Sequence, residues 1–296
     1  MRLVGHAFAL RPFRALGVAL LGLALSASAL ASERWLVLGG DIAETLSALG
    51  AEQHVVARDD TVVYPPEMAA LPSVGYLRQL SAESVLSVSP TRILAAEQAG
   101  PRKVLEQLAA VGVAVEVVSA PASLEAIAHK VRHISEYIGE PQAGSALAES
   151  LTSDLERLAA LPPLPDIQAM FILQHSGLTP RAAGRETAAH TALEAVGLHN
   201  AFAEMTGYHN VSAEALVQRS PEVVVMSTRG LEALGGEEAL WSLPGMAMTP
   251  AGSDQRLIVV DDQALLGFGP RTPEALLTLR QQVEALLSHH AAQASR

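Results

Sequence analysis

One segment of the chain occurs twice, and this duplication limits the architecture more than any other feature of the sequence. Both copies contain Gly-Tyr, Ser-Ala-Glu and Ser-Pro in this order, the first in residues 75–94 and the second in residues 207–225. Ser81 and Ser212 are good N-caps, and a glutamate in the first turn complements the helix dipole. Two independent capped helices are the alternative explanation. The shared motifs in register favour two similar lobes whose equivalent loops face a cleft, where a ligand is expected.

Short apolar runs rich in β-branched residues alternate with longer helical patterns. Seven runs predict strands: Arg34–Leu38, His54–Ala57, Arg92–Ala95, Val113–Val118, Gln168–Leu173, Val223–Met226 and Leu257–Asp261. The longest helical pattern, Leu124–Leu161, is interrupted at residues 139–141 and stops at the Pro-Pro-Leu-Pro of residues 162–165. Strands that alternate with helices favour parallel sheets. The sequence therefore predicts an α/β protein of two Rossmann-like lobes with parallel sheets, joined by a long backbone helix.

The N-terminus predicts secretion. An apolar core, Ala15–Leu25, follows three arginines and precedes Ala29-Leu30-Ala31, which is typical of a cleavable signal peptide. This core is shorter than the roughly 20 residues that a membrane span needs, so no direct membrane insertion is expected. We expect a periplasmic protein with a signal peptide in residues 1–31, an N-terminal lobe in 32–140, a linking helix in 141–165 and a C-terminal lobe in 166–296.

Charge and residue usage exclude several classes of function. With 20 Lys and Arg against 31 Asp and Glu, the chain lacks the basic surface that nucleic-acid binding requires. It has no cysteine, which excludes disulfides, thiolate metal sites and cysteine nucleophiles. No dinucleotide loop or serine-hydrolase elbow is present. His129 and His133 lie four residues apart without an H-E-x-x-H motif, so a solvated helix face is the favoured interpretation. We expect no enzyme.

Tyr76 is the first candidate for a ligand-binding residue. Aromatic residues make up only 4% of the chain, which makes each tyrosine informative. A phenolate oxygen is a hard anionic donor suited to ferric iron, and tyrosine is a known axial ligand of haem. Arg78, two residues along, can lie on the same side of an extended segment, where its charge favours the ionised phenol. From the residues alone, a packing role for Tyr76 in a turn stays open.

Residues 74–83, Val-Gly-Tyr-Leu-Arg-Gln-Leu-Ser-Ala-Glu, resemble the signature of periplasmic haem-binding proteins of bacterial haem ABC importers. The resemblance extends from Trp35 to about Leu287 and includes residues 174–177, 183–187, 227–232 and 267–272. It implies a monomeric substrate-binding protein of the helical-backbone class that captures haem between two lobes and delivers it to an ABC permease. In that family the tyrosine of the first motif is the axial iron ligand, and the resemblance assigns this role to Tyr76, with Arg78 beside it.

The resemblance also suggests further haem contacts. His175 follows the predicted strand Gln168–Leu173 at its carboxyl end, where α/β proteins place ligands. In some family members a histidine at this place ligates the iron of a second haem; a backbone-bonded loop histidine is the alternative, and one haem is expected. Arg185 and Arg229 match haem propionates, with a solvated arginine as the alternative for each. Tyr208, in the second copy of the repeat, is expected to contact the porphyrin without ligating iron.

Glu83 and Glu214 are the predicted permease contacts. Taken alone, each is most simply an acid that compensates a helix dipole. In related importer proteins one exposed glutamate on each lobe docks to arginines of the permease, which suggests the same role for this duplicated pair. Two other functions remain as alternatives: a corrinoid or ferric-siderophore binding protein of the same architecture, and, less favoured, a secreted metal-dependent hydrolase.

Overall fold

The computed structural model describes residues 33–294, except residues 120, 122 and 175–178, and for residues 289–294 it describes the backbone alone. The predicted signal peptide lies outside the described residues. The chain divides into two units, Met1–Glu33 and Arg34–Arg296. Both sheets belong to the second unit, so the lobe boundaries predicted at residues 140 and 165 stay predictions. No helix among the described residues is both long and apolar enough to cross a membrane.

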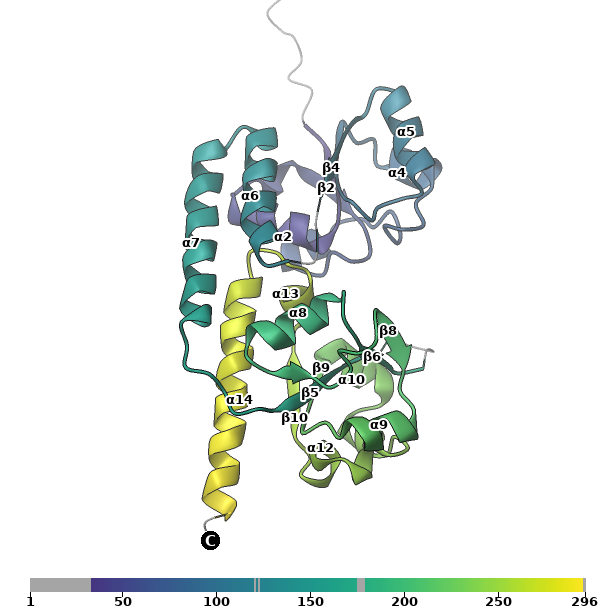
Figure 1. Ribbon diagram of the computed structural model, residues 1–296. Helices are drawn as coiled ribbons and strands as arrows, with labels where there is room; N and C mark the ends of the chain where they lie inside the picture. The colour runs from purple at the N-terminus through teal and green to yellow at the C-terminus, as the bar shows by residue number, and fades with distance from the viewer. Residues whose placement is uncertain (1–32, 120, 122, 175–178, 295–296) are drawn as a thin grey trace, which may run out of the picture. The chain divides into compact units, whose positions relative to one another are not determined.

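The first sheet has four strands, and all neighbouring strands run parallel (Figure 1). In spatial order they are β2 (Val55–Arg58), β1 (Trp35–Leu38), β3 (Arg92–Ala96) and β4 (Ala114–Val118). Every residue of β1 is buried, as expected for a strand covered on both faces. The connecting helices are η1 (Glu52–His54), α2 (Gly40–Ala48), α3 (Pro66–Ala69), α4 (Ala82–Ser87) and α5 (Arg102–Ala110). The four strands predicted here are confirmed, each end to within one residue.

The second sheet is mixed. Its order is β10 (Leu257–Val260), β9 (Val223–Ser227), β5 (Gln168–Leu173), β6 (Arg181–Ala183) and β8 (Tyr208–Asn210), and β7 (His199–Asn200) also pairs with β5. The three predicted strands, β5, β9 and β10, are confirmed and run parallel. However, β6 lies antiparallel to β5, and β8 lies antiparallel to β6. These short strands were not predicted, because two or three residues carry no readable alternation.

Helices cover both faces of the second sheet. They are α8 (Ala188–Ala195), α9 (Ala213–Arg219), α10 (Thr228–Leu234), α11 (Glu237–Trp241), η2 (Met246–Met248), α12 (Pro250–Ser253), α13 (Asp262–Leu266) and α14 (Thr272–Ala294). Alternate residues of β5 enter two different cores: Ala169 and Phe171 belong to one, and Met170 and Ile172 to the other. Because both faces are buried, the carboxyl ends of the strands are the part of this sheet left for a ligand.

The helical segment between the sheets is a hairpin. The predicted pattern Leu124–Leu161 forms α6 (Glu125–Ile138) and α7 (Pro141–Ala159), which pack side by side (Figure 1). Gly139 ends α6 in the left-handed conformation with φ 84°, and Pro141 begins α7, as the sequence break suggests. The helices are close because Gly144 faces Ser135, where a Cβ would lie 1.8 Å from the serine Oγ. α7 thus occupies the predicted linking segment, and α14 packs against it.

The two copies of the sequence repeat have the same local fold. Ser81 and Ser212 both cap their helices, because each side chain accepts a hydrogen bond from the backbone N–H three residues on. Ser89 and Ser220, which precede the shared prolines, both adopt a positive φ, 47° and 48°. Each copy then enters an inner strand of its sheet, β3 or β9. The repeat is therefore a structural duplication and not a chance match of caps.

Candidate functional site

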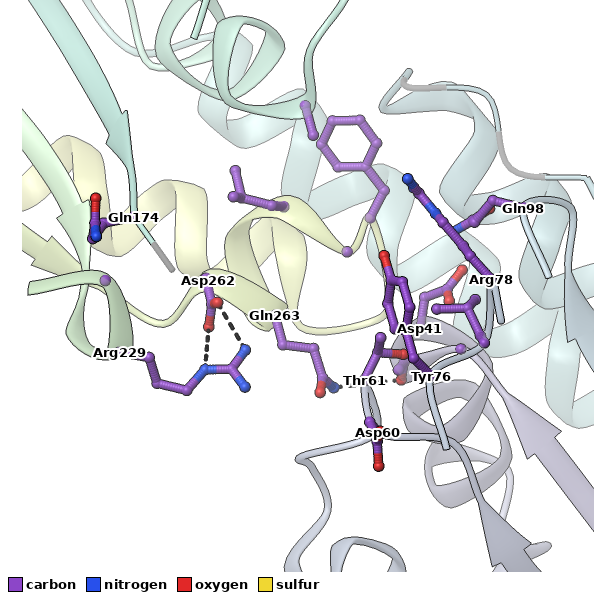
Figure 2. A pocket seen from close by; sticks show the side chains of 18 of the residues that line it. Asp41, Asp60, Thr61, Tyr76, Arg78, Gln98, Gln174, Arg229, Asp262 and Gln263 are labelled. Carbon is purple, nitrogen blue, oxygen red and sulfur yellow. Dashed lines mark hydrogen bonds and ion pairs between the residues drawn. The ribbon is translucent and has the colours of Figure 1, made fainter. Parts of the chain in front are cut away.

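A cleft of about 580 Å³ is lined by residues of both sheets' loops (Figure 2). Residues that follow six strands contribute to it: Gly39, Asp60 and Gln98 after β1, β2 and β3, and Gln174, Arg229 and Asp262 after β5, β9 and β10. This is the carboxyl edge at which open α/β sheets bind ligands. The volume lies within the range of about 300–1,000 Å³ that is usual for small-molecule sites.

Tyr76 lines this cleft and is 41% exposed. Its loop is held by the flanking residues Val74 and Leu77, which are 4% and 3% exposed. The loop backbone is also fixed, because the Asp60 N–H donates to the Gly75 carbonyl at 3.0 Å and the Gln79 N–H donates to the Tyr76 carbonyl at 2.8 Å. Among the described residues the Tyr76 phenol has no hydrogen-bond partner. A fixed backbone therefore presents an uncommitted phenol oxygen to the cleft.

Arg78 rises from the same loop and also lines the cleft (Figure 2). It is exposed, and no carboxylate lies within ion-pair distance of its guanidinium in the part of the chain that the structure describes. The structure thus brings Tyr76 and Arg78 to one site. A guanidinium without an acidic partner among the described residues can bind a ligand carboxylate.

The floor of the cleft contains a buried ion pair. The Lys130 ammonium, on α6, contacts the Asp41 carboxylate, on α2, and donates to the Phe268 carbonyl at 3.0 Å. The two side chains are only 2% and 9% exposed. Sequence reasoning missed all three residues, although residues 267–272 were among the motifs that carry the resemblance. The lysine joins three segments that are far apart in the chain.

Asp59 fixes the wall above this floor. Its carboxylate is fully buried and accepts hydrogen bonds from the N–H groups of Gly39 at 2.9 Å and Thr61 at 2.8 Å. Burial raises the pKa of the Asp59 carboxyl, and these two hydrogen bonds oppose the rise. The loops after β1 and β2 are therefore tied to one side chain that does not itself reach the ligand space.

Arg229 stands on the opposite wall, near the start of α10 (Figure 2). Its guanidinium binds the Asp262 carboxylate through two contacts, Nη2 to Oδ2 at 2.7 Å and Nε to Oδ1 at 3.3 Å. The arginine side chain is 54% exposed. A ligand carboxylate that reaches Arg229 must share it with Asp262 or displace that residue.

Tyr208 and Arg185 do not line the cleft. Tyr208 packs against the core of the second sheet. Burial raises the pKa of its phenol, while a hydrogen bond with Thr187 and the nearby Arg181 lower it. Arg185 is exposed, and its backbone pairs with Thr206 away from the cleft residues. His175 lies outside the described residues. The structure thus assembles Tyr76, Arg78 and Arg229 at the cleft, and does not bring Tyr208 or Arg185 there.

Glu83 and Glu214 also lie away from the cleft. Each is the second residue of its helix, α4 or α9, and each is exposed. Neither has an ion-pair partner among the described residues. His129 and His133 are exposed on α6, and His133 contacts Glu116 at 2.6 Å. Within the described ranges no three His, Asp or Glu residues form a group that could hold a metal ion.

A second buried polar cluster adjoins the cleft through Gln263. The Glu44 carboxylate, 3% exposed, accepts from Arg271 at 2.7 Å and from the Gln263 amide at 2.5 Å. The Gln263 carbonyl oxygen accepts from the Val63 N–H at 3.0 Å. The Arg271 guanidinium lies 3.8 Å from the centre of the Tyr64 ring. Burial raises the pKa of the Glu44 carboxyl against the lowering effect of Arg271. This cluster joins loops of the two sheets behind the ligand space.

Comparison with known proteins identifies the family. The family model described as periplasmic binding protein matches residues 36–264. The structure of the periplasmic heme-binding protein RhuT from Roseiflexus sp. RS-1 is 37% identical, with a TM-score of 0.80 over 85% of this chain and 97% of that one. The periplasmic heme-binding protein BhuT, in complex with two hemes, is 36% identical, with a TM-score of 0.79 over 84% and 97%.

One similar protein is named for a different ligand. The vitamin B12-binding protein of Photorhabdus laumondii is 27% identical over 210 residues, which are 69% of this chain and 72% of the relative. The matched family and these relatives are all binding proteins and not enzymes. RhuT and BhuT share the α/β architecture found here. Because the family model covers most of the chain, and because the geometry is that of a ligand-binding cleft, this chain belongs to the periplasmic binding protein family.

Proposed function

We propose that this protein is a periplasmic substrate-binding protein that captures haem in its cleft and delivers it to an ABC importer. The observation that carries the proposal is the loop with Tyr76 and Arg78, which presents to one cleft a phenol and a guanidinium that have no partner among the residues the structure describes. The similarity to RhuT and BhuT supports haem as the ligand.

In this proposal Tyr76 binds the ferric iron through its phenolate oxygen, and Arg78 stabilises that negative charge. A hard anionic donor favours ferric over ferrous iron. One dominant bond between protein and metal leaves release feasible once the permease opens the cleft. The protein itself catalyses no reaction; it binds its ligand reversibly and hands it over.

The remaining predicted contacts complete the proposed site. Arg229 binds a haem propionate in place of Asp262, since a guanidinium matches a carboxylate in two-point geometry. Arg185, after β6, and Tyr208, in β8, stay predicted haem contacts. His175 stays the predicted ligand of a second haem. The BhuT complex holds two hemes, yet one haem per protein is the expectation here.

Delivery is proposed to use Glu83 and Glu214. Both carboxylates are exposed at equivalent places of the repeat, as a two-point contact with basic residues of a permease requires. We further propose that residues 1–31 are a signal peptide, that residues 32–140 and 166–296 are the lobes with a linking helix in 141–165, and that the mature protein is a periplasmic monomer. Charge reversal at both glutamates should abolish uptake and spare ligand binding.

The experiment that tests haem binding is an ultraviolet–visible titration of the ligand-free mature protein with ferric haem. We expect a saturable high-spin ferric spectrum that collapses in Tyr76→Ala and in Tyr76→Phe, since both lack the phenol oxygen. Tyr64→Phe is the matched control: Tyr64 is 38% exposed but does not line the cleft. The break point of the titration gives one or two haems.

The rival is a corrinoid-binding protein, favoured by the relative from Photorhabdus laumondii. Corrinoids need no tyrosinate on the metal, so Tyr76→Ala would barely change their affinity. Absence of a saturable change with haem, together with tight binding of cobalamin in both variants, would establish the rival. If Tyr76→Phe binds haem as well as the wild type, the proposed function stands but the iron ligand is another residue, and His175 would be tested next.

A further inference from the structure

The two copies of the repeat have the same surface as well as the same backbone. Residues 81–90 and 212–221 are exposed, half-buried or buried in the same order at all ten positions. Val85 and Leu216, at equivalent places, are both fully buried and anchor the two helices to their sheets. The outward faces of α4 and α9 are therefore duplicated, with the same amino acid at five of the ten paired positions.

Each duplicated face carries an apolar side chain beside its glutamate. Leu86 and Val217 occupy equivalent places, and each is 42% exposed. They follow Glu83 and Glu214 by three residues, so on each helix the carboxylate and the apolar group are neighbours. Isolated exposed leucines or valines need no explanation. Two at equivalent positions with the same exposure, each next to an acid without an ion-pair partner among the described residues, form a repeated pattern.

The charges near the second patch do not cancel its glutamate. Arg219, at the end of α9, binds Glu204 through Nη2 and Oε2 at 2.5 Å. That pair raises the pKa of Arg219 and lowers that of Glu204, so both groups stay charged and satisfied by each other. Glu214 is consequently left for a partner, as Glu83 is on the first lobe.

We propose that Glu83 with Leu86, and Glu214 with Val217, form two equivalent docking patches for a two-fold symmetric permease whose two halves each present a basic side chain beside an apolar pocket. This rests on the proposed delivery to a permease and adds the apolar contacts of Leu86 and Val217. Two similar surfaces on one chain fit a partner that offers the same surface twice. Opposite charge on the partner complements the two carboxylates.

The apolar half of each patch has a physical role. An ion pair between exposed groups contributes little and is screened by salt. Covering Leu86 or Val217 adds apolar burial that salt does not weaken. Binding through both patches of the same chain then multiplies the two affinities. The charges of the glutamates raise the rate of association with the permease, and the apolar contacts lower the rate of dissociation.

The test uses the full mature protein and the permease–ATPase complex of the source organism's haem importer in lipid nanodiscs. The variants are Leu86→Ser, Val217→Ser and the double variant. The matched controls are Val111→Ser and Met248→Ser, which change side chains that are 65% and 72% exposed outside the patches. Haem titration and thermal melting of each variant establish that ligand binding and folding are unchanged, since all four side chains are exposed.

We expect each single variant to bind the permease about five- to tenfold more weakly, and the double variant to approach the product of the two losses. Raising the salt to about 0.5 M should weaken the wild type through its glutamates and leave the ratio between wild type and Leu86→Ser unchanged. Controls should match the wild type. Equal binding by wild type and both serine variants, or loss in only one of them, would overturn the proposal.

The outcomes separate this proposal from the function on which it rests. If wild-type protein binds neither haem nor the permease, the proposed function fails and the docking patches fail with it. If the wild type binds both, and charge reversal at Glu83 and Glu214 abolishes docking while the serine variants bind normally, delivery stands and the apolar patches are refuted. Serine variants that change self-association in sedimentation, and not permease binding, would assign the patches to a second copy of this chain and also refute the proposal.

Discussion

Replacement of Lys130 by methionine is the most informative single perturbation of the cleft floor. Methionine retains the unbranched shape and removes the charge. The Asp41 carboxylate, 9% exposed, would lose its one described charged partner, and the Phe268 carbonyl would lose the donor at 3.0 Å. Breaking a buried pair from one side leaves an uncompensated charge in a poorly solvated place, at a cost of about 3–5 kcal/mol. Lys130→Met should lower the free energy of unfolding by that amount.

The same argument predicts strong coupling between the two partners. In the double variant Asp41→Asn, Lys130→Met no charge is left buried, so its loss should be smaller than the sum of the two single losses by about 2 kcal/mol or more. The assay is urea unfolding of the ligand-free mature protein followed by circular dichroism, with the midpoint and slope fitted for each variant. Arg102→Met is the control, because Arg102 and its partner Glu106 are 91% and 66% exposed; its midpoint should not move.

Two results would refute this reasoning. A loss of less than about 1 kcal/mol in Lys130→Met would mean that water reaches Asp41 and screens its charge. Additive losses in the double variant would mean that the two groups are stabilised separately and that the floor is not held by their contact.

Two further predictions concern Glu44, behind the cleft, and Gly144, where α7 packs against α6. Burial raises the folded-state pKa of Glu44, so the wild type takes up a proton on folding and loses stability as the pH rises from the ordinary carboxyl range through that raised pKa. Glu44→Gln should make this loss of stability smaller in thermal melts between about pH 4 and pH 8. A pH dependence equal to that of the wild type would contradict the prediction. Gly144→Ala would place a Cβ 1.8 Å from the Ser135 Oγ and should lower the free energy of unfolding in urea by about 1–3 kcal/mol. The double variant Gly144→Ala, Ser135→Gly should recover the lost stability. If it does not, the strain lies elsewhere.

The inner strands β1, β3, β5 and β9 were predicted correctly because their apolar runs are buried on both faces, a property that each strand carries in its own residues. The strands β2, β4 and β10 are only partly buried, and their apolar, β-branched residues still predicted them. β6 and β8 have no such signal. Arg181–Ala183 and Tyr208–Asn210 are strands because they pair with each other and with β5, with Ala183 opposite Tyr208. Such short strands depend on register with a distant partner, which the local pattern does not contain. The second sheet is therefore mixed where the sequence predicted a parallel one.

Tyr76 and Tyr208 show how a repeat can mislead about a site. From Ser-Ala-Glu to Ser-Pro the copies superpose in spacing, but Tyr76 precedes its capping serine by five residues and Tyr208 by four. The single-residue difference places Tyr208 in β8, where its ring packs against the core of the second sheet. Tyr76 stays in a loop that opens on the cleft. Equivalence of helices therefore does not extend to the loops that precede them.

Lys130 carried a signal that sequence reasoning did not use. It lies three residues after Ile127 and four before Ile134, both of which are fully buried, so it belongs to the apolar stripe of α6. His129 and His133 lie on the other face and are exposed, as predicted. A lysine inside an apolar stripe must find an acid when the helix packs. The position of that acid, Asp41 on a helix 89 residues earlier, is fixed only by the tertiary fold.

The charges of the cleft argue for the order in which an anionic ligand engages it. Two of its three basic groups are already neutralised, in the pairs Lys130–Asp41 and Arg229–Asp262. Arg78 alone among the described lining cations has no acidic partner. A ligand carboxylate gains the full energy of an ion pair with Arg78. At Arg229 it gains only the difference between its own ion pair and the existing pair with Asp262, because it must replace that carboxylate. Recognition of an anionic ligand should therefore begin at the loop of the first lobe, and the second wall engages as its own ion pair yields.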